Sequence, residues 1–328
     1  MKALLLTDSS FSVEDVPPPV PGEHDALVKL KTAALNHRDL FIREGLYAKI
    51  VLPAILGSDG CGVVEQTPEF HHLIGRRVII DPSMDWGPDP MAQGRDYSIL
   101  GMPRSGTLAE YVAVPAANLY EAPAHLTDEQ AAALPLSGVT AWRALMVQGK
   151  CSEHDTVLVT GTGGGVATMA VQFAVASGAR VLVTSSSNDK LARAIKLGAQ
   201  GGVNYTSETW TKDLMAIYGQ PDLIIDGAGG VGFNDLTNIV KPGGRIVLYG
   251  ATRGTTPNAN MHRIFWKQLR ITGSTMGTSV DFGDMISFVA DKQIVPEVDS
   301  VIPLDRVVEA FDRMRMGAQY GKLVVRIS

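Results

Sequence analysis

The chain has 328 residues, of which 45% are hydrophobic and 19% charged, and its 29 basic and 34 acidic side chains give a net charge of −5. This length predicts about two domains, each able to bury a core, and the composition excludes disordered and collagen-like proteins. Because basic residues are not in excess, nucleic acid and anionic membranes are not expected as partners, and small molecules are.

Cysteine content and the first residues indicate the compartment. Cys61 and Cys151 are the only cysteines, too few for a disulfide framework or a four-thiolate zinc site. Residues 1–8 contain one lysine and an apolar run of four, which is shorter than a signal-peptide core or a membrane span. We therefore expect a cytoplasmic protein.

The first part of the chain, to about residue 122, has short β-like runs separated by turn residues, a pattern typical of an antiparallel, loop-rich domain. The expected strands are Ala3–Leu6, Leu27–Leu30, Gly62–Glu65, Arg77–Ile80 and Ala109–Val114. Pro82–Ser105 is rich in Pro, Gly and Asp, and loops of this length are usually functional or contact a partner.

From Thr156, short apolar strands alternate with helical patterns, as in a parallel sheet covered on both faces. The expected strands are Thr156–Thr160, Arg180–Thr184, Gly202–Tyr205, Asp222–Asp226, Arg245–Tyr249 and Leu269–Gly273. The expected helices are Gly165–Ser177, Asp189–Leu197, Thr209–Tyr218 and Phe233–Val240. Strands joined in this way predict a doubly wound α/β sheet.

After Met276 the pattern changes again. A helix is expected at Phe282–Asp291, a strand at Ser300–Ile302, a helix at Leu304–Met314 and a final strand at Lys322–Ile327. We expect these elements to complete the first domain.

A glycine-rich turn follows the strand Thr156–Thr160 and leads into an Ala-rich helix. Gly161, Gly164 and Ala167 have a G-x-x-G-x-x-A spacing, with Gly165 and Val166 at the helix start. Glycines let the backbone approach a pyrophosphate, and the helix N-terminus offers unpaired N–H groups to its charge. The turn therefore predicts dinucleotide binding; the alternative is a purely structural tight turn.

The end of the second strand indicates which dinucleotide. An acidic residue expected there for the ribose hydroxyls of NAD is missing. The sequence instead runs Ser185, Ser186, Ser187, Asn188, Asp189 and Lys190. The hydroxyls and the lysine suit a 2′-phosphate, so NADPH is expected over NADH, although Asp189 opposes this. Ser187 or Asn188 would also serve as the N-cap of the next helix.

Three stretches resemble the medium-chain dehydrogenase/reductases of the zinc-type alcohol dehydrogenase-like superfamily, and specifically their zinc-free, quinone-oxidoreductase-like branch. They are residues 36–40 with 53–60, residues 134–142, and the glycine turn with Gly198-Ala199. The resemblance covers the whole chain. It implies a GroES-like substrate domain from residues 1–122 and 278–328, a Rossmann domain from residues 123–277, and an active site in the cleft.

The residues at the family's zinc positions differ from those of zinc-dependent alcohol dehydrogenases. Those enzymes have a Cys where Asn36 stands and a His-Glu pair where Ser58-Asp59 stands. Their third ligand is expected near residues 132–136, which here are only Ala, Leu and Pro. Because zinc needs converging thiolate, imidazole or carboxylate groups, we expect no metal.

Without a Lewis acid, alcohol oxidation loses its usual electrophile, whereas a quinone or enone spreads charge onto an oxygen that hydrogen-bond donors can stabilise. The resemblance likewise implies NADPH-dependent reduction of quinones, enones or enoyl thioesters. It places Asn36 near the nicotinamide and the substrate oxygen, with Asp39 orienting the loop and Tyr47 as a candidate donor or proton relay. Thr140 matches a family threonine facing the nicotinamide; alternatively it caps its helix.

The resemblance implies further cofactor contacts. His37 is expected against the pyrophosphate, and Ser186, Lys190 and Tyr205 at the 2′-phosphate, beside Ser185. The residues expected to line the cofactor along the carboxyl edge of the sheet are Gly250, Ala251, Thr252, Thr275 and Met276.

Two other functions remain open from the sequence. One is an alcohol or aldehyde dehydrogenase working without zinc, and the other is a non-catalytic NADPH-binding protein with a sensor or crystallin-like role. Relatives commonly dimerise through the edge strand of the cofactor domain, here Leu269–Gly273, so a homodimer is expected.

Overall fold

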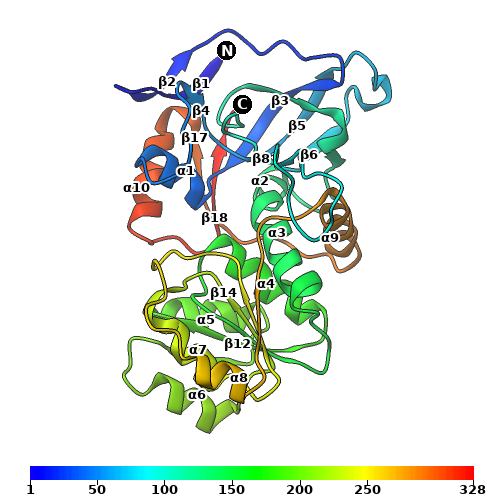
Figure 1. Cartoon of the computed structure of the whole chain (residues 1–328). Helices are drawn as coiled ribbons and strands as arrows, with labels where there is room; N and C mark the ends of the chain where they lie inside the picture. Colours follow the sequence, from blue (N-terminus) through cyan, green and yellow to red (C-terminus); the bar gives the residue numbers. More distant parts are fainter. The chain divides into compact units, whose positions relative to one another are not determined.

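The computed structural model describes all 328 residues, which form two compact units (Figure 1). Unit 1 comprises Met1–Ser137 and Thr278–Ser328, and unit 2 comprises Gly138–Gly277. Unit 1 is therefore built from both ends of the chain. No helix has the length and apolarity that a membrane span requires.

Unit 1 is a β-rich unit with one large and one small sheet. The large sheet has the order β10-β6-β5-β3-β18-β17, with β9 also paired to β3, and the small sheet has the order β2-β1-β4. The strands of the large sheet are β3 (Asp25–Ala34), β5 (Asp59–Gln66), β6 (Arg77–Ile80), β9 (Tyr111–Pro115), β10 (Leu119–Glu121), β17 (Val298–Pro303) and β18 (Lys322–Arg326). The small sheet contains β1 (Lys2–Leu6), β2 (Phe11–Asp15) and β4 (Ala54–Ile55).

The helices of unit 1 are α1 (His37–Arg43), α2 (Asp128–Ala132), α9 (Ser279–Asp291) and α10 (Val307–Arg315), and α3 (Pro135–Trp142) crosses the boundary between the units. Short 3₁₀ turns occupy residues 71–73, 116–118 and 304–306. The segment Pro82–Ser105, expected as a loop, contains a small hairpin of β7 (Ser83–Met84) and β8 (Ser98–Ile99).

The first domain boundary differs from the expected one. The sequence predicts the second domain from residue 123, whereas residues 123–137 belong to unit 1. The reason is the packing of α2 on β3 and β5, where the Thr32 hydroxyl donates to the carbonyl of Asp128 at 2.7 Å and Arg77 pairs with its carboxylate at 2.6 Å.

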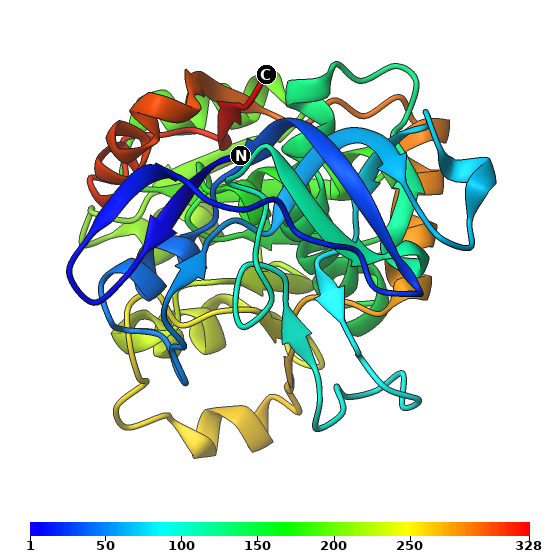
Figure 2. The same ribbon diagram turned by 90° about the horizontal axis from the view of Figure 1, so that it is seen from above.

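The two chain ends meet in the large sheet. Strand β18 pairs antiparallel with β3, with Val324 opposite Ala34, and Figure 2 shows both termini close together in unit 1. The pairing continues past β3, where the Leu35 N–H donates to the Leu323 carbonyl at 3.0 Å. This register places Lys322 beside Asn36, residues at opposite ends of the sequence.

Unit 2 is a parallel sheet in the order β13-β12-β11-β14-β15-β16 with crossover helices. Its strands are β11 (Thr156–Val159), β12 (Arg180–Ser185), β13 (Gly201–Asn204), β14 (Leu223–Asp226), β15 (Arg245–Leu248) and β16 (Arg270–Gly273). Its helices are α4 (Gly165–Ala176), α5 (Asn188–Lys196), α6 (Trp210–Tyr218), α7 (Phe233–Ile239) and α8 (Met261–Trp266), with a π-helical turn at 143–148 and a 3₁₀ turn at 230–232.

The order of these strands confirms the predicted doubly wound α/β fold, because the chain moves outward from β11 first in one direction and then in the other. All six expected strands and four expected helices are present, each within one residue of its predicted ends. Only α8 lacks a sequence signal of its own. The central strands β11, β12 and β14 are buried on both faces, as their continuous apolar runs predict.

Candidate active site

Asn36 stands at the turn from β3 into α1. Its backbone is extended, and its N–H donates to Oδ2 of Asp39 at 2.8 Å, which closes the first turn of the helix. The other carboxylate oxygen of Asp39 accepts from the Gly57 N–H at 3.2 Å. Complete burial raises the pKa of Asp39, although the Arg38 charge and these two N–H donors act in the opposite direction. Asp39 thus ties α1 to the segment that carries Ser58 and Asp59.

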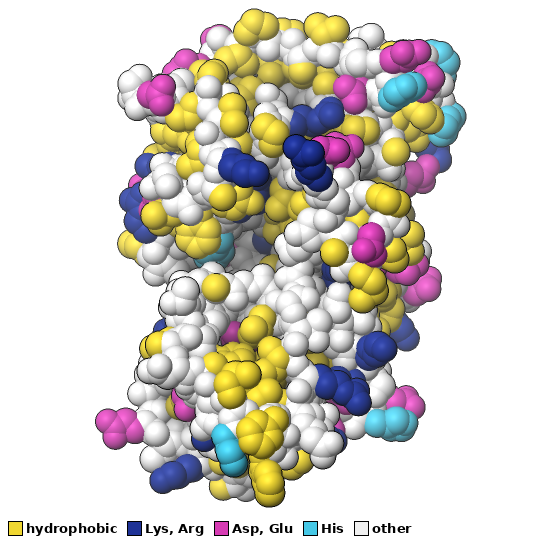
Figure 3. All heavy atoms as spheres, in the orientation of Figure 1, with side chains coloured by type: hydrophobic (Ala, Val, Ile, Leu, Met, Phe, Trp, Pro, Cys, Tyr) yellow, Lys and Arg dark blue, Asp and Glu magenta, His cyan; other side chains and the backbone are white.

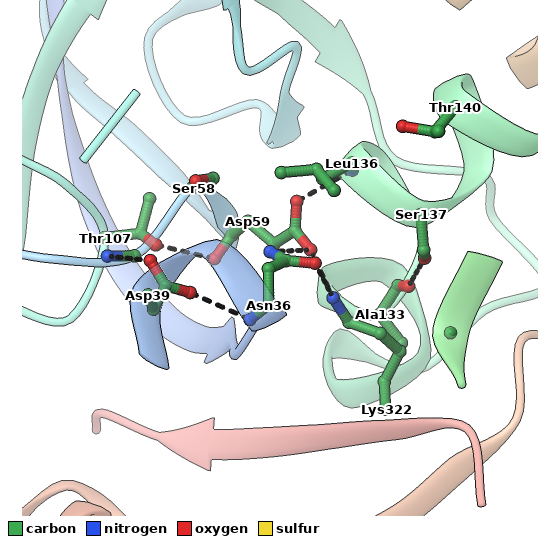
Figure 4. Close-up of polar contacts among 12 residues, drawn as sticks. Asn36, Asp39, Ser58, Asp59, Thr107, Ala133, Leu136, Ser137, Thr140 and Lys322 are labelled. Atoms are coloured by element: carbon green, nitrogen blue, oxygen red, sulfur yellow. Dashed lines mark hydrogen bonds and ion pairs between the residues drawn. The ribbon is translucent and has the colours of Figure 1, made fainter. Parts of the chain in front are cut away.

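A buried polar network joins Asn36, Asp59 and Lys322 (Figure 4). Lys322 Nζ lies 2.7 Å from Asp59 Oδ2 and 2.5 Å from Asn36 Oδ1, and Asn36 Nδ2 donates to Asp59 Oδ2 at 3.0 Å. The Leu136 N–H satisfies the other Asp59 oxygen at 2.8 Å. Asp59 is fully buried and Lys322 is 4% exposed. The two charges therefore compensate each other where water cannot.

Sequence reasoning missed Lys322. The lysine opens the final strand, which was predicted, but its partners lie 263 and 286 residues earlier in the chain. The only signal for the contact would have been the pairing of β18 with β3, and strand pairing over such a separation has no local pattern.

Ser58 is held in a second set of hydrogen bonds. Its hydroxyl donates to the Leu100 carbonyl at 2.7 Å and accepts from Arg38 Nη1 at 2.9 Å. The same guanidinium donates to the Leu100 carbonyl, and its carbon lies 5.2 Å from the centre of the Tyr47 ring. Arg38 therefore connects Ser58, Tyr47 and the segment Pro82–Ser105.

The residues at the family's zinc positions do not suit a zinc ion. Asn36 and Ser58 offer an amide and a hydroxyl, and the Asp59 carboxylate already carries the Lys322 ammonium. Zinc prefers thiolate, imidazole or carboxylate ligands, and an ammonium group on the one carboxylate repels a cation. No group of three or more His, Cys, Asp or Glu side chains is arranged to hold a metal.

In unit 2, the glycine turn between β11 and α4 has the geometry of an anion site. Gly161 and Gly163 have φ of +63° and +128°, which favour glycine, and Gly164 is the N-cap of α4 without a side-chain cap. A Cβ at Gly161 or Gly164 would meet no atom within 4 Å. The first N–H groups of α4 have no partner within the helix. A pyrophosphate fits this turn.

Gly163 is a residue that the predicted site omitted. A Cβ there would lie 2.7 Å from Cδ of Lys190, so the lysine side chain crosses the turn. The run of three glycines was the available signal, but the motif spacing selected only Gly161 and Gly164.

The three serines at the end of β12 have different environments. Ser187 caps α5 by accepting from the Lys190 N–H at 3.4 Å, so the capping alternative is confirmed for Ser187, and Asn188 is the first helical residue. Ser185 is buried and its hydroxyl donates to the Thr162 carbonyl at 3.3 Å. Ser186 is exposed.

Thr140 and Met276 come together in unit 2. The Thr140 hydroxyl lies 3.6 Å from the Met276 sulfur, both residues are buried, and Met276 has a positive φ of 43°. Gly250, Ala251 and Thr252 follow β15 and are exposed, as is Thr275 after β16. His37 begins α1 in unit 1, exposed, with its ring centre 6.3 Å from that of Phe41.

Comparisons with known proteins agree with this architecture. The family model described as alcohol dehydrogenase GroES-like domain matches residues 22–124, and the one described as zinc-binding dehydrogenase matches residues 165–291. A zinc-type alcohol dehydrogenase-like protein YogA from Leptosphaeria maculans is 37% identical, over 94% of this chain and 92% of that protein. An acryloyl-coenzyme A reductase from Sulfurisphaera tokodaii is 28% identical, over 99% and 100%.

Among solved structures, one described as an NAD-dependent alcohol dehydrogenase superposes with a TM-score of 0.94 at 35% identity, covering both chains completely. The chain therefore belongs to the medium-chain dehydrogenase/reductases, within the zinc-type alcohol dehydrogenase-like superfamily, which confirms the resemblance to that superfamily. It is an NAD(P)-dependent medium-chain oxidoreductase.

Proposed function

We propose that this oxidoreductase delivers hydride from NADPH to an activated double bond or a quinone, and that it does so without zinc. The observation that carries the proposal is the Lys322–Asp59 ion pair, both of whose members hydrogen-bond to the Asn36 side-chain amide. It occupies the positions at which zinc-dependent members of the family hold their metal.

The network makes Asn36 a fixed hydrogen-bond donor. Its carbonyl oxygen accepts from the Lys322 ammonium, which polarises the amide and strengthens its N–H groups as donors. One N–H of Nδ2 is bonded to Asp59, and the second remains for a ligand oxygen. A conjugated acceptor develops negative charge on such an oxygen, and a donor positioned beforehand stabilises it. An isolated carbonyl or an alcohol needs a stronger electrophile.

Unit 2 supplies the residues for the cofactor. We assign the pyrophosphate to Gly161, Gly164, Gly165 and Val166, with His37 of unit 1 as an additional contact. When bound, NADPH supplies the hydride. Thr140 and Met276 are assigned to its nicotinamide end with Gly250, Ala251, Thr252 and Thr275, and Ser185, Ser186, Lys190 and Tyr205 to its adenosine end. The serines at the end of β12, in place of an acid, support NADPH over NADH.

Reduction of a double bond also requires a proton. Tyr47 is a phenol of unit 1 near the network, and its ring centre lies 5.2 Å from the Arg38 guanidinium carbon. Arg38 in turn binds Ser58, the neighbour of Asp59. We assign Tyr47 as the proton donor and Asp39 as the residue that positions Asn36.

The names of the relatives support two chemistries, because one is an acryloyl-coenzyme A reductase and two are named as alcohol dehydrogenases or as similar to them. Alcohol or aldehyde dehydrogenase activity is thus the second candidate. A non-catalytic, NADPH-binding sensor is the third.

One assay separates these functions. The purified protein is offered NADPH, with NADH in parallel, against a quinone, an enone, an enoyl-coenzyme A thioester and an aldehyde, and the loss of reduced nicotinamide absorbance is followed. We expect NADPH-selective turnover on the conjugated acceptors. Turnover only on aldehydes would contradict the proposal in favour of the alcohol dehydrogenase function, and NADPH binding without any turnover would favour the sensor.

We further propose a cytoplasmic homodimer. Both cysteines are unpaired, which suits a reducing compartment. Strand β16 ends the parallel sheet, and the preceding helix α8 exposes Met261, Phe265 and Trp266 by 65%, 64% and 74%. Figure 3 shows hydrophobic side chains gathered over this part of unit 2. Light scattering tests the proposal, since a monomer at all concentrations would contradict it.

A further inference from the structure

An arginine from one side of the parallel sheet reaches a tyrosine on the other. Arg253 follows β15 and Tyr205 follows β13, with β12, β11 and β14 between these strands. At a strand spacing of about 4.8 Å, β13 and β15 lie roughly 19 Å apart. Nevertheless, Nη2 of Arg253 donates to the Tyr205 hydroxyl at 3.2 Å, and its Cζ lies 4.8 Å from the ring centre. Arg253 and Tyr205 therefore bridge the carboxyl edge of the sheet.

The bridge has a defined base. The N–H groups of Thr252 and Arg253 donate to the carbonyls of Gly227 and Ala228 at 3.2 and 2.8 Å. Gly230 has a φ of +66°, and a Cβ there would lie 2.6 Å from the Arg253 carbonyl oxygen. The turns after β14 and β15 therefore interlock, and the close approach depends on glycine.

The other end of the bridge lies beside the end of β12. The Tyr205 N–H donates to the Ser185 carbonyl at 3.0 Å, and the neighbouring Asn204 amide donates to the Ser186 carbonyl at 3.3 Å. In doubly wound dinucleotide-binding sheets, the end of the second strand is where the adenosine ribose is recognised. Arg253 thus brings a guanidinium, from a distant loop, to the position where a 2′-phosphate distinguishes NADPH from NADH.

We propose that Arg253, which lies against the Tyr205 ring, binds the adenosine 2′-phosphate and thereby determines the cofactor selectivity of the enzyme. This inference rests on the proposed use of NADPH. The Arg253 guanidinium exchanges its bond to the uncharged Tyr205 hydroxyl for bonds to the negatively charged phosphate. These bonds are stronger because both partners are charged, and the planar guanidinium makes them in pairs. The contact with the ring, 4.8 Å from Cζ to the ring centre, restrains the position of the guanidinium. NADH has no 2′-phosphate, so Arg253 keeps its hydrogen bond to Tyr205.

The test measures binding without any acceptor. Calorimetry with the whole protein compares adenosine 2′,5′-bisphosphate with 5′-AMP for the wild type and for Arg253→Gln. We expect the variant to bind the bisphosphate about ten- to a hundredfold more weakly, the range of one charge-assisted hydrogen bond, with the affinity for 5′-AMP unchanged. Lys212→Gln on α6, an exposed position, controls for the loss of one positive charge and leaves both affinities unchanged.

Tyr205→Phe refines the assignment because it keeps the ring and removes the hydroxyl. We expect this variant to lose at most a small part of the affinity for the bisphosphate, because the ring that contacts Arg253 remains. A loss as large as that of Arg253→Gln would place the phosphate on the hydroxyl and overturn the proposal, as would an Arg253→Gln variant that weakens both ligands equally or neither. If the wild type itself does not prefer the bisphosphate, the proposed use of NADPH fails first; if it does and Arg253→Gln keeps the preference, only the role of Arg253 fails.

Discussion

The candidate site residues of the two units differ in burial and in hydrogen bonding. In unit 1, Asn36, Asp59 and Lys322 are buried and satisfy one another. In unit 2, Gly161 and Gly164 face open space, and Ser186 and Arg253 are exposed.

The site residues of unit 1 are held in place before any ligand binds, whereas those of unit 2 gain their partners from the ligand. The network of unit 1 resists water and holds one amide in a fixed orientation, which is the requirement for stabilising a developing charge. The carboxyl edge of unit 2 offers backbone donors and cations to a ligand that brings its own negative charges. Substitutions that break the buried Lys322–Asp59 pair of unit 1 should therefore affect stability first, and substitutions in the glycine turn of unit 2 should affect binding first.

Lys322→Met should have the largest effect. It leaves the Asp59 carboxylate buried without a counter-charge, so the free energy of unfolding should fall by about 3–5 kcal/mol in denaturant titrations. The double variant Lys322→Met, Asp59→Asn removes both charges and should recover most of this loss. A loss of unfolding free energy below about 1 kcal/mol for the single variant would show that the ion pair is not shielded from water.

Asn36→Ala should mainly affect catalysis. Removing one donor to a developing oxyanion lowers kcat by about 10²–10³-fold, so kcat on a conjugated acceptor should fall by this amount. The affinity for NADPH, measured by fluorescence, should stay the same because the amide is assigned to the acceptor. An unchanged kcat would remove Asn36 from the reaction.

Gly164→Ala tests the other side of the comparison. The backbone of Gly164 has an ordinary φ of −82° and its Cβ direction is open, so the free energy of unfolding should change by less than about 1 kcal/mol. The methyl group projects into the space assigned to the pyrophosphate, and NADPH affinity should fall at least about tenfold. Gly283→Ala in α9 is the control and should leave NADPH affinity unchanged. Undiminished binding by Gly164→Ala would move the phosphate elsewhere.

Asp81→Asn should change only the pH dependence of stability, and below about pH 4, where folded and unfolded chains both hold the Asp81 proton, its effect should be the smallest of the four. Burial raises the pKa of Asp81 to about 8, and the Asp81 Oδ2 atom has no hydrogen-bond partner. The unfolded chain loses this proton near pH 4 and the folded chain near pH 8, so wild-type stability falls between these values by up to about 1.4 kcal/mol per pH unit. The asparagine variant lacks this slope. Parallel stability profiles of the two proteins would contradict the raised pKa.

The sequence predicts much of unit 2 because its signals are local. Apolar strands alternate with amphipathic helices, and the glycine turn and the serines after β12 lie next to the elements that use them. Helix α8 was missed because its six residues are too few for a periodic pattern. The Ser187 cap was among the sequence alternatives, whereas the reach of Arg253 to Tyr205 spans the sheet and has no counterpart in the sequence pattern.

In unit 1 the sequence identifies Asn36, Ser58 and Asp59 as the residues that differ from the family's zinc ligands, but not the lysine that pairs with Asp59. Lys322 reaches them only because the last strand pairs with β3. The domain boundary was predicted too early, at residue 123, for a similar reason, since α2 packs against strands far from it in sequence. Contacts made by the chain ends are non-local, and hydrophobic periodicity does not encode them.

The central claim is that an internal ion pair stands in place of the catalytic metal. The most direct test is the zinc content of the protein, produced in zinc-supplemented medium, together with its turnover on an enone before and after dialysis against a chelator. The account predicts far less than one zinc per chain and the same turnover after dialysis. One tightly held zinc per chain, whose removal abolishes turnover and whose return restores it, would contradict the account.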